Sequence, residues 1–184
     1  MHPERPTEVI FIGGRSGVGK SSVAAEASHL LARAEVRHAV IEGDNLDQAY
    51  PQPWREGIDL AGRNLAAIWQ NYRAIGYSRL LYTNTVSVLE IRALSAALGG
   101  QVRSFGVLLT AADETATRRL AQRERGSALD DHRERSTRTA VRLDTASTAY
   151  RVATDGRSLT DIATEILSKA GWLDGTTAPS TADT

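Results

Sequence analysis

The sequence contains no cysteine and very little lysine: of its 22 basic residues, only Lys20 and Lys169 are lysine. The absence of cysteine excludes disulfides, thiolate metal sites and cysteine nucleophiles. The basic residues are balanced by 22 acidic ones, so the chain lacks the net positive charge on which non-specific nucleic-acid binding depends. No apolar run approaches the roughly 18 residues that a membrane-spanning helix needs. We therefore expect a cytoplasmic protein that binds neither nucleic acid nor membranes.

The length of 184 residues suits one domain, which at this size buries roughly 70% of the surface that the unfolded chain exposes. Residues 1–7 contain no apolar core of a signal peptide. Residues 174–184 are Gly, Thr, Ser, Ala, Pro and Asp, a composition too polar to bury much surface. We expect a flexible N-terminus over 1–7, a folded domain over 8–173 and a disordered tail over 174–184.

Short β-branched runs alternate along the chain with stretches of helical spacing, and they predict five strands and five helices. The expected strands cover 9–12, 39–41, 79–83, 102–109 and 149–153, and the expected helices cover 21–34, 65–75, 88–98, 112–125 and 159–170. The apolar stripe of helix 65–75 is Leu65, Ile68, Trp69, Tyr72 and Ile75, and that of helix 159–170 is Leu159, Ile162, Ala163, Ile166 and Leu167. Such alternation produces right-handed βαβ units, so the predicted fold is a three-layer α/β domain with a parallel sheet between helices.

A complete G-x-x-x-x-G-K-[ST] motif lies between the first expected strand and the first expected helix. It comprises Gly14, Arg15, Ser16, Gly17, Val18, Gly19, Lys20 and Ser21, which we call the phosphate loop. Gly14 and Gly19 permit backbone angles at which N–H groups turn toward phosphate oxygens, and the helix start adds its positive dipole. Lys20 supplies a charge for the β- and γ-phosphates, and Ser21 offers a hydroxyl to Mg²⁺. A glycine turn with a solvated lysine is the alternative, and it leaves the strand–helix context of the motif unexplained.

Three classes of nucleotide-binding protein share this motif. A GTPase would carry an N-K-x-D motif and a D-x-x-G directly after a strand, and the sequence has neither. A ring-forming ATPase would need a second acidic motif and a helical lid domain, for which 184 residues are few. A small-molecule kinase needs an acid on the acceptor side and a basic flap. The sequence favours the kinase.

Three segments together resemble the nucleoside and nucleotide kinase branch of the P-loop proteins: Gly14 to Ser22, Glu42-Gly43-Asp44-Asn45, and Arg119-Leu120-Ala121-Gln122-Arg123. Within this branch the chain is similar, over about residues 8–170, to adenylylsulfate, gluconate and shikimate kinases and to chloramphenicol phosphotransferase-like resistance enzymes. The resemblance implies a P-loop NTPase sheet with strand order 2-3-1-4-5 and a hinged lid at about 124–139. It also implies a monomer or homodimer that uses ATP and Mg²⁺ to phosphorylate a hydroxyl of a small molecule, either a metabolite or an antibiotic.

Asp44 is the candidate catalyst. It follows the second expected strand, and ligands of open α/β sheets bind where the strands end. In the family that the chain resembles, an acid here takes the proton of the acceptor hydroxyl or orients the waters of the metal, so Asp44 is also a candidate metal ligand together with Ser21. Glu42 lies two residues earlier and is expected to point to the other side. A solvated Gly-Asp-Asn turn is the alternative at this position.

Arg119 and Arg123 lie one turn apart on one face of the fourth expected helix. The resemblance places Arg119 against the adenine or the α-phosphate and Arg123 near the transferred phosphoryl group, with Ser22 also at the nucleotide. It places the base between Arg119 and the loop after the fifth expected strand, Thr154-Asp155-Gly156-Arg157, where Asp155 and Gly156 are the candidate contacts. Residues 118–142 hold eight arginines and four acidic residues, an excess that favours a flap closing over a polyanion. A solvated helix face explains some of these arginines equally well.

One position departs from the family pattern. Many of the relatives end the third strand in an acid for Mg²⁺, whereas here the strand 79–83 is followed by Asn84. Either Asp44 does the work of both acids, or phosphoryl transfer is slow or absent. The open alternative is a regulatory protein that binds ATP and hydrolyses it weakly. The four histidines offer no other metal site, because they lack metal-ligand spacing.

Overall fold

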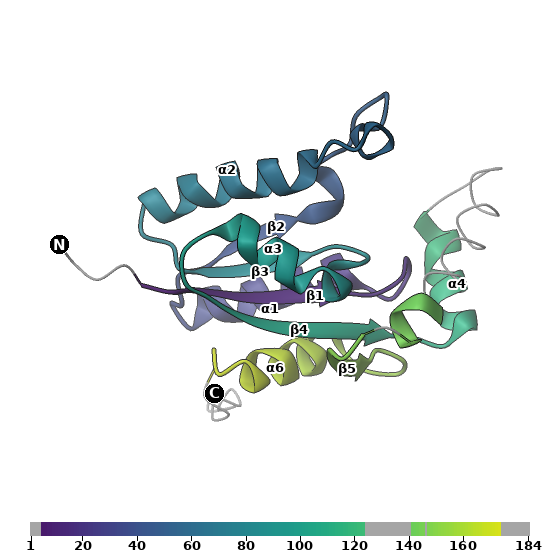
Figure 1. The fold of residues 1–184 in the computed structure, drawn as a ribbon. Helices are drawn as coiled ribbons and strands as arrows, with labels where there is room; N and C mark the ends of the chain where they lie inside the picture. Colours follow the sequence, from purple (N-terminus) through teal and green to yellow (C-terminus); the bar gives the residue numbers. More distant parts are fainter. Residues whose placement is uncertain (1–4, 124–140, 146, 174–184) are drawn as a thin grey trace, which may run out of the picture.

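The computed structural model of the chain describes residues 5–123, 141–145 and 147–173. Five parallel strands form one sheet in the order β2-β3-β1-β4-β5, which is the order that the resemblance implied (Figure 1). The strands are β1 (Thr7–Gly13), β2 (Ala39–Glu42), β3 (Arg79–Thr83), β4 (Val102–Thr110) and β5 (Tyr150–Ala153). The helices are α1 (Lys20–Arg33), α2 (Leu60–Ala74), α3 (Ile91–Leu98), α4 (Asp113–Arg123) and α6 (Leu159–Lys169), with short 3₁₀ turns η1 (Gly43–Asn45), η2 (Pro53–Glu56) and η3 (Ser87–Leu89).

Both faces of the sheet are covered, because its strands are apolar on both sides. Along β1, Ile10 and Ile12 pack into a core with α1 and α6, whereas Val9 and Phe11 pack into a second core with α2 and α3. Figure 1 shows α2 above the strands and α6 below them. A parallel sheet that is buried on both faces has continuous apolar runs, which is why the run at 9–12 shows no polar alternation. The predicted three-layer arrangement is confirmed.

The elements differ from the prediction mainly at their ends. Trp69 is fully buried, as its stripe predicted, and its indole N–H donates to Oγ1 of Thr7 (3.1 Å). β1 begins at Thr7, whose backbone pairs with β4, one residue before the expected domain start. Two stripe positions were predicted wrongly. Ile75 is 61% exposed because it follows the last residue of α2, and Leu159 is 44% exposed because it begins α6. The helix expected at 88–98 is divided, since η3 precedes α3.

The parallel strands bring the predicted site residues to one edge of the sheet. All five carboxyl ends lie there, and we call this edge the carboxyl edge. The phosphate loop, η1, the turn after β3, α4 and the turn after β5 all follow strands at this edge, on the right of Figure 1. Open α/β sheets bind their ligands at such an edge.

Candidate active site

Three glycines of the phosphate loop have backbone conformations that L side chains rarely adopt: φ is 142° at Gly14, 87° at Gly17 and 100° at Gly19. A Cβ at Gly17 would overlap the backbone carbonyl of Ala116 in α4, and a Cβ at Gly14 would lie 2.7 Å from the carbonyl oxygen of Leu109. A Cβ at Gly19 would meet no described atom within 4 Å. The motif singled out Gly14 and Gly19, and the structure adds that Gly17 lets α4 pack directly on the loop.

The start of α1 faces the phosphate loop without a competing carboxylate. Gly19 is the N-cap, no side chain of the described residues caps the helix there, and the first turn contains no acidic residue. The positive end of the helix dipole is therefore directed at the loop, an arrangement that binds phosphate groups. Ser21 is exposed at the second position of α1, and Ser22 lines the cavity beside the loop.

Lys20, the first residue of α1, folds back over the loop. Its Nζ donates to the carbonyl oxygen of Gly14 (2.9 Å) and lies 3.5 Å from that of Arg15 and 3.4 Å from Oγ1 of Thr85. The charge of Lys20 therefore lies next to the loop backbone, at the start of α1 and near the exit of β3.

The side chain of Arg15 points away from the loop, and only 5% of it is exposed. Its guanidinium donates to the carbonyl oxygen of Ala111 (3.1 Å) and pairs with the carboxylate of Asp113 (2.6 Å). Arg15 thus fixes the loop to the start of α4. Because its side chain is engaged there, only its backbone could take the nucleotide-binding role that was predicted for it. Within the loop, Val18 is buried and Ser16 is half-buried.

A cavity of about 310 Å³ opens beside the phosphate loop, between α1, α4 and the segment from β5 to α6. The guanidinium of Arg119 is fixed at its wall: it donates to Oγ1 (3.0 Å) and to the carbonyl oxygen (3.3 Å) of Thr154, and it lies 3.4 Å from the carbonyl oxygen of Val18. The volume of this cavity is in the lower range of ligand pockets. The lining residues are Gly17, Val18, Gly19, Ser22, Val23, Arg119, Thr154, Arg157, Leu159 and Ile162.

Two polar residues of this cavity belong to the loop that the resemblance placed at the base, although neither was itself predicted as a nucleotide contact. Thr154 is buried, and its hydroxyl and carbonyl oxygen both hold Arg119. Arg157 lies at the same cavity, three residues further along the chain. The available signal was their position, since both flank the predicted residues Asp155 and Gly156 in the turn after β5.

Arg157 is oriented by Glu165 of α6. The guanidinium pairs with Oε2 of Glu165 (2.7 Å), and Oε1 of the same carboxylate accepts from the hydroxyl of Tyr150 (2.8 Å). Burial acts to raise the pKa of Glu165, but the hydrogen bonds from Tyr150 and Arg157 outweigh it and leave this pKa below its ordinary value. The Glu165 carboxylate is therefore charged at neutral pH and holds Arg157 at the cavity.

Asp155 contacts the start of α4. Its Oδ2 accepts from the N–H of Ala112 (2.9 Å), the residue before the helix. Hydrogen bonds from the Thr115 hydroxyl and from this N–H hold the pKa of Asp155 below its ordinary value. The carboxylate is thus engaged with α4, while Gly156 beside it (φ 66°) has open surroundings. The nucleotide roles assigned to these two residues stay predictions.

Asp44 lies in η1, directly after β2, and is exposed at the carboxyl edge. Its Oδ1 accepts from the N–H of Thr85 (3.4 Å), and Oγ1 of Thr85 lies 3.4 Å from Nζ of Lys20. The structure therefore brings the predicted acid and the predicted lysine to two sides of one residue. The sequence did not single out Thr85, whose only signal was its place after the exit of β3.

Asn84 and Glu42, the other polar residues at the strand exits, have different surroundings. Oδ1 of Asn84 accepts from the N–H of Val86 (2.9 Å), and its carbonyl oxygen accepts from the hydroxyl of Ser87 (3.2 Å). These contacts form the turn after β3. Glu42 is the last residue of β2 and is half-buried.

Tyr82 lies under the turn that carries Asp44. Its ring is buried against Gly43, where a Cβ would overlap the phenol oxygen. Burial, and after it the negative charges of nearby carboxylates led by Asp44, raise the pKa of Tyr82, so its hydroxyl stays protonated. Position 43 therefore requires glycine for space, a requirement that the sequence pattern did not reveal.

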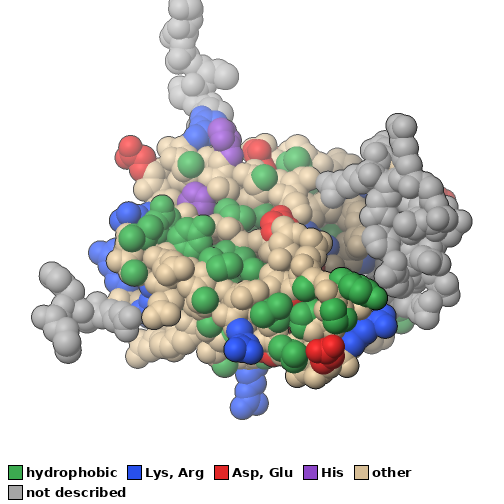
Figure 2. All heavy atoms as spheres, turned by 90° about the horizontal axis from the view of Figure 1, so that it is seen from above, with side chains coloured by type: hydrophobic (Ala, Val, Ile, Leu, Met, Phe, Trp, Pro, Cys, Tyr) green, Lys and Arg blue, Asp and Glu red, His purple; other side chains and the backbone are tan. Residues whose placement is uncertain are grey.

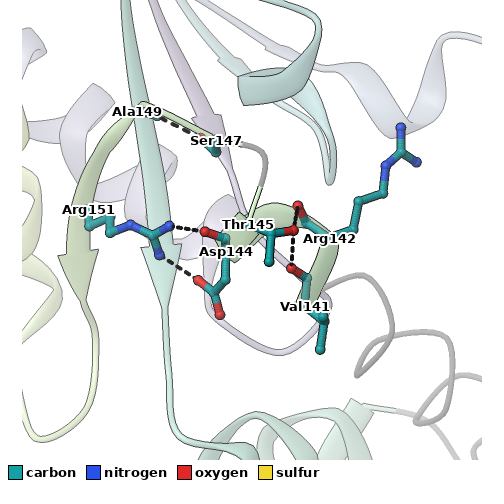
Figure 3. A network of polar contacts seen from close by, with 7 residues as sticks. All are labelled: Val141, Arg142, Asp144, Thr145, Ser147, Ala149 and Arg151. Carbon is teal, nitrogen blue, oxygen red and sulfur yellow. Dashed lines mark hydrogen bonds and ion pairs between the residues drawn. The ribbon is translucent and has the colours of Figure 1, made fainter.

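Arg123 is the last residue of α4, and the lid expected at 124–139 lies outside the described residues. The chain is described again in a helical stretch at 141–145. There the guanidinium of Arg151 in β5 donates to Oδ1 (2.5 Å) and to the carbonyl oxygen (2.7 Å) of Asp144 (Figure 3). Leu143 is buried against Leu108 of β4. This stretch is therefore anchored to the sheet through both strands.

The donor set at the carboxyl edge fits a metal that arrives with its nucleotide. Within the described ranges, no group of three or more His, Asp or Glu side chains is placed to hold a metal ion alone. Mg²⁺ in phosphoryl-transfer sites takes one or two protein groups and completes its shell with phosphate and water. The exposed hydroxyl of Ser21 and the exposed carboxylate of Asp44 suit such a shell.

Comparison with protein families and with curated protein sequences finds no match. Solved structures do match. A gluconokinase from Sinorhizobium meliloti superposes with a TM-score of 0.58 at 22% identity, over 92% of this chain and 94% of its own. A tunicamycin resistance protein from Deinococcus radiodurans gives 0.60 at 18% identity, over 91% and 97%. The Mycobacterium tuberculosis APS kinase, in complex with AMPPNP and APS, gives 0.52 at 22% identity, over 90% and 98%. The chain therefore has the fold of the P-loop small-molecule kinases.

Proposed function

We propose that this chain is a phosphotransferase that moves the γ-phosphoryl group of ATP, bound with Mg²⁺, to a hydroxyl of a small molecule. The observation that carries the proposal is the convergence of Lys20 and Asp44 on Thr85 at the carboxyl edge. A lysine for the phosphates and an acid for the acceptor are needed at one place in such a transfer. The fold that the chain shares with a gluconokinase and an APS kinase supports the same class of reaction.

The nucleotide would occupy the phosphate loop and the cavity beside it. The loop backbone and the start of α1 receive the phosphates, and Lys20 turns from the carbonyl oxygen of Gly14 to the β- and γ-phosphates. Arg119 borders the base or the α-phosphate. Because Thr154 already holds its guanidinium, little side-chain freedom is lost when the nucleotide binds.

Phosphoryl transfer needs a group on the acceptor side and charge on the side of the leaving phosphate. ATP with Mg²⁺ supplies the phosphoryl group and spreads its developing charge. Asp44 accepts the proton of the acceptor hydroxyl or orients the waters of the metal, and its exposure gives the acceptor direct access. We assign Arg123, at the end of α4, to the transferred phosphoryl group on the resemblance alone, since Arg123 follows Arg119 by one turn of the same helix.

The segment between Asp44 and α2 carries exposed apolar side chains, which favour an acceptor that itself has some apolar surface. It exposes three large side chains, Tyr50 (93%), Trp54 (56%) and Ile58 (43%). Figure 1 shows this segment projecting beyond the sheet on the side of the carboxyl edge. A gluconokinase and a tunicamycin resistance protein share the fold, so a metabolite and an antibiotic both stay candidate acceptors.

A second candidate function is an ATP-dependent regulatory protein that hydrolyses ATP weakly. The observation that favours it is Asn84, which has no charge and is engaged in the turn after β3. Such a protein would consume ATP at the same rate with or without an acceptor.

ATP turnover with and without acceptors separates the two functions. ³¹P NMR would follow ATP, inorganic phosphate and any new phosphomonoester in the presence of pooled nucleosides, sugar acids or antibiotics. A phosphotransferase should give a phosphomonoester with one pool and little phosphate without it. Release of phosphate alone, at one rate in every pool, would contradict the proposal. Tryptophan fluorescence gives a second readout, that of acceptor binding near Trp54. Trp54 is exposed whereas Trp69 and Trp172 are buried, so a fluorescence change on acceptor binding should disappear in the control variant Trp54→Phe.

A further inference from the structure

The turn after β3 contains two polar residues in succession, and only the second faces the site. The side chain and the carbonyl oxygen of Asn84 bond to Val86 and Ser87 within the turn. Thr85 instead contacts three parts of the site with three different groups. Its carbonyl oxygen accepts from the N–H of Gly14 (3.1 Å), its hydroxyl lies 3.4 Å from Nζ of Lys20, and its N–H donates to Oδ1 of Asp44 (3.4 Å).

These contacts connect the residue that would bind the phosphates, Lys20, with the residue that would face the acceptor, Asp44. The Gly14 contact joins the backbone of Thr85 to the phosphate loop, so the hydroxyl of Thr85 is held at a fixed place relative to the loop. A hydroxyl can accept from an ammonium group and donate to an oxygen at the same time. The contacts to Lys20 and Asp44 are long, as hydrogen bonds between catalytic groups often are before a substrate is bound.

We propose that Thr85 is a positioning residue, which holds the ammonium of Lys20 over the phosphate loop through its hydroxyl and the carboxylate of Asp44 beside it through its N–H. Its kinetic consequence rests on the proposed function, but the contact with Lys20 does not. Thr85 does not contact the reacting atoms in this role. It sets the distance between the group that binds the phosphates and the group that faces the acceptor.

Three substitutions test the role of the hydroxyl. Thr85→Val removes it and keeps the branched shape and the backbone N–H, whereas Thr85→Ser keeps the hydroxyl and removes only the methyl group. Thr83→Val is the matched control: Thr83 lies two residues earlier, is fully buried, and its Oγ1 has no hydrogen-bond partner among the described residues. Loss of a hydroxyl without a partner is not expected to disturb the fold. Thermal unfolding of all three variants verifies that they are folded.

The composition of the chain allows a readout that does not depend on activity. Lys20 and Lys169 are its only lysines, so protein labelled with ¹³C at the lysine ε-carbon gives two side-chain NMR signals. Nζ of Lys169 lies 5.8 Å from the centre of the Tyr150 ring, and its signal serves as the internal control. Lys169→Arg removes that signal and so assigns both. Thr85→Val should move the Lys20 signal and leave the Lys169 signal in place, while Thr85→Ser and Thr83→Val should leave both close to those of the parent. An unmoved Lys20 signal in Thr85→Val would overturn the proposal.

Kinetics then test the consequence of positioning. With an accepted substrate, Thr85→Val should lower kcat about 10- to 100-fold, the usual effect of removing a group that orients an active-site residue, with a much smaller change in KM for ATP. Thr85→Ser should restore most of the rate. A Thr85→Ser variant as slow as Thr85→Val would show that the hydroxyl alone does not sustain the rate, and it would contradict the proposal. If the parent protein transfers no phosphoryl group, the proposed function fails, and the NMR result decides separately whether Thr85 holds Lys20.

Discussion

Gly17 and Gly19 have similar backbone conformations and different surroundings. Both have positive φ, 87° and 100°, but only Gly17 lies against another backbone, that of Ala116 in α4. The motif specifies Gly19 and leaves position 17 open. In the structure, position 17 is the more constrained of the two.

Gly17→Ala is therefore expected to cost more stability than Gly19→Ala. Positive φ costs an alanine about 1 kcal/mol at either position. Overlap with the carbonyl of Ala116 adds roughly 1–3 kcal/mol at position 17, because a backbone atom cannot rotate away as a side chain can. Urea unfolding of the two variants measures the difference, and equal losses would show that α4 does not pack on the loop.

The carboxylate of Asp44 can be tested without disturbing the nucleotide site. Asp44→Asn removes the charge and keeps the shape, so affinity for an unreactive ATP analogue should change little. Phosphoryl transfer should fall by about 10²–10⁴, the usual contribution of a positioned acid or base. Glu42→Gln, two residues earlier, is the matched control and should keep most of the rate.

The dependence on Mg²⁺ separates the two roles considered for Asp44. An Asp44→Asn variant that regains its rate as Mg²⁺ is raised would assign the carboxylate to the metal. An ordinary rate at ordinary Mg²⁺ concentration would reduce Asp44 to a turn residue, and Glu42 would become the next acid to test.

At the residue scale, the sequence predicted the side chains whose place follows from a motif and missed those placed by distant segments. Lys20 was singled out by its motif and Asp44 by its place after a strand and by the resemblance, and the structure has both at the carboxyl edge. Arg15 and Asp155 were also singled out as site residues, but their side chains bond to Ala111 and Ala112, which lie 96 and 43 positions away in the sequence. No local pattern reveals such partners. Thr85 was missed because a single threonine after a strand belongs to no motif.

At the scale of the element, α4 is fixed at its start by groups from two other segments. Arg15 of the phosphate loop pairs with Asp113, and Asp155 from the turn after β5 accepts from Ala112. Alanine at the position before the helix has no side-chain acceptor, and Asp155 accepts from the N–H of this alanine, one of the N–H groups at the helix start that have no partner within the helix. The helix that carries Arg119 is therefore tied both to the loop and to the opposite wall of the cavity.

Asp155→Ala should lower the free energy of unfolding near neutral pH by at most about 1 kcal/mol, the net contribution of a typical hydrogen bond. Because Asp155 is exposed, hydrogen bonds to water offset part of this loss. The Thr115 hydroxyl and the Ala112 N–H lower the pKa of Asp155, so the folded state favours the carboxylate. Its contribution is present above the ordinary carboxyl pKa and is lost as the pH falls through the lower pKa of the folded state.

Urea unfolding of the parent and Asp155→Ala across the acid range checks this sign. The two free energies of unfolding should differ at neutral pH and converge at the acid end. Thr115→Val removes the largest cause of the lowered pKa and should shrink the pH-dependent part of the difference. A difference that stays constant with pH would mean that the carboxylate does not cap α4.

At the scale of the whole molecule, the alternation of apolar runs predicted the three layers, because a parallel sheet must bury both of its faces. Alternation does not determine strand order, which came from the resemblance and is confirmed. The ends of elements were less predictable. The helix expected from 88 starts later because the bond between Ser87 and Asn84 holds the chain in a turn.

The surface reflects the balanced composition. Figure 2, seen from above relative to Figure 1, shows apolar side chains in small separate patches and side chains of both charge signs on the visible face. No helix within the described ranges is long and apolar enough to cross a membrane. Arginine supplies nearly all of the positive charge of the chain, and one of the two lysines stands in the phosphate loop.

The pair of lysines gives the most direct test of the central claim, that the phosphate loop binds ATP for phosphoryl transfer. ATP consumption with the acceptor pools would be measured for the parent, for Lys20→Ala and for the control Lys169→Ala, which removes the other lysine from α6. The account predicts that Lys20→Ala loses about 10²–10³ in rate, on the order of 3 kcal/mol for one electrostatic donor, while Lys169→Ala stays close to the parent. A Lys20→Ala variant that turns over ATP at nearly the parent rate would contradict it.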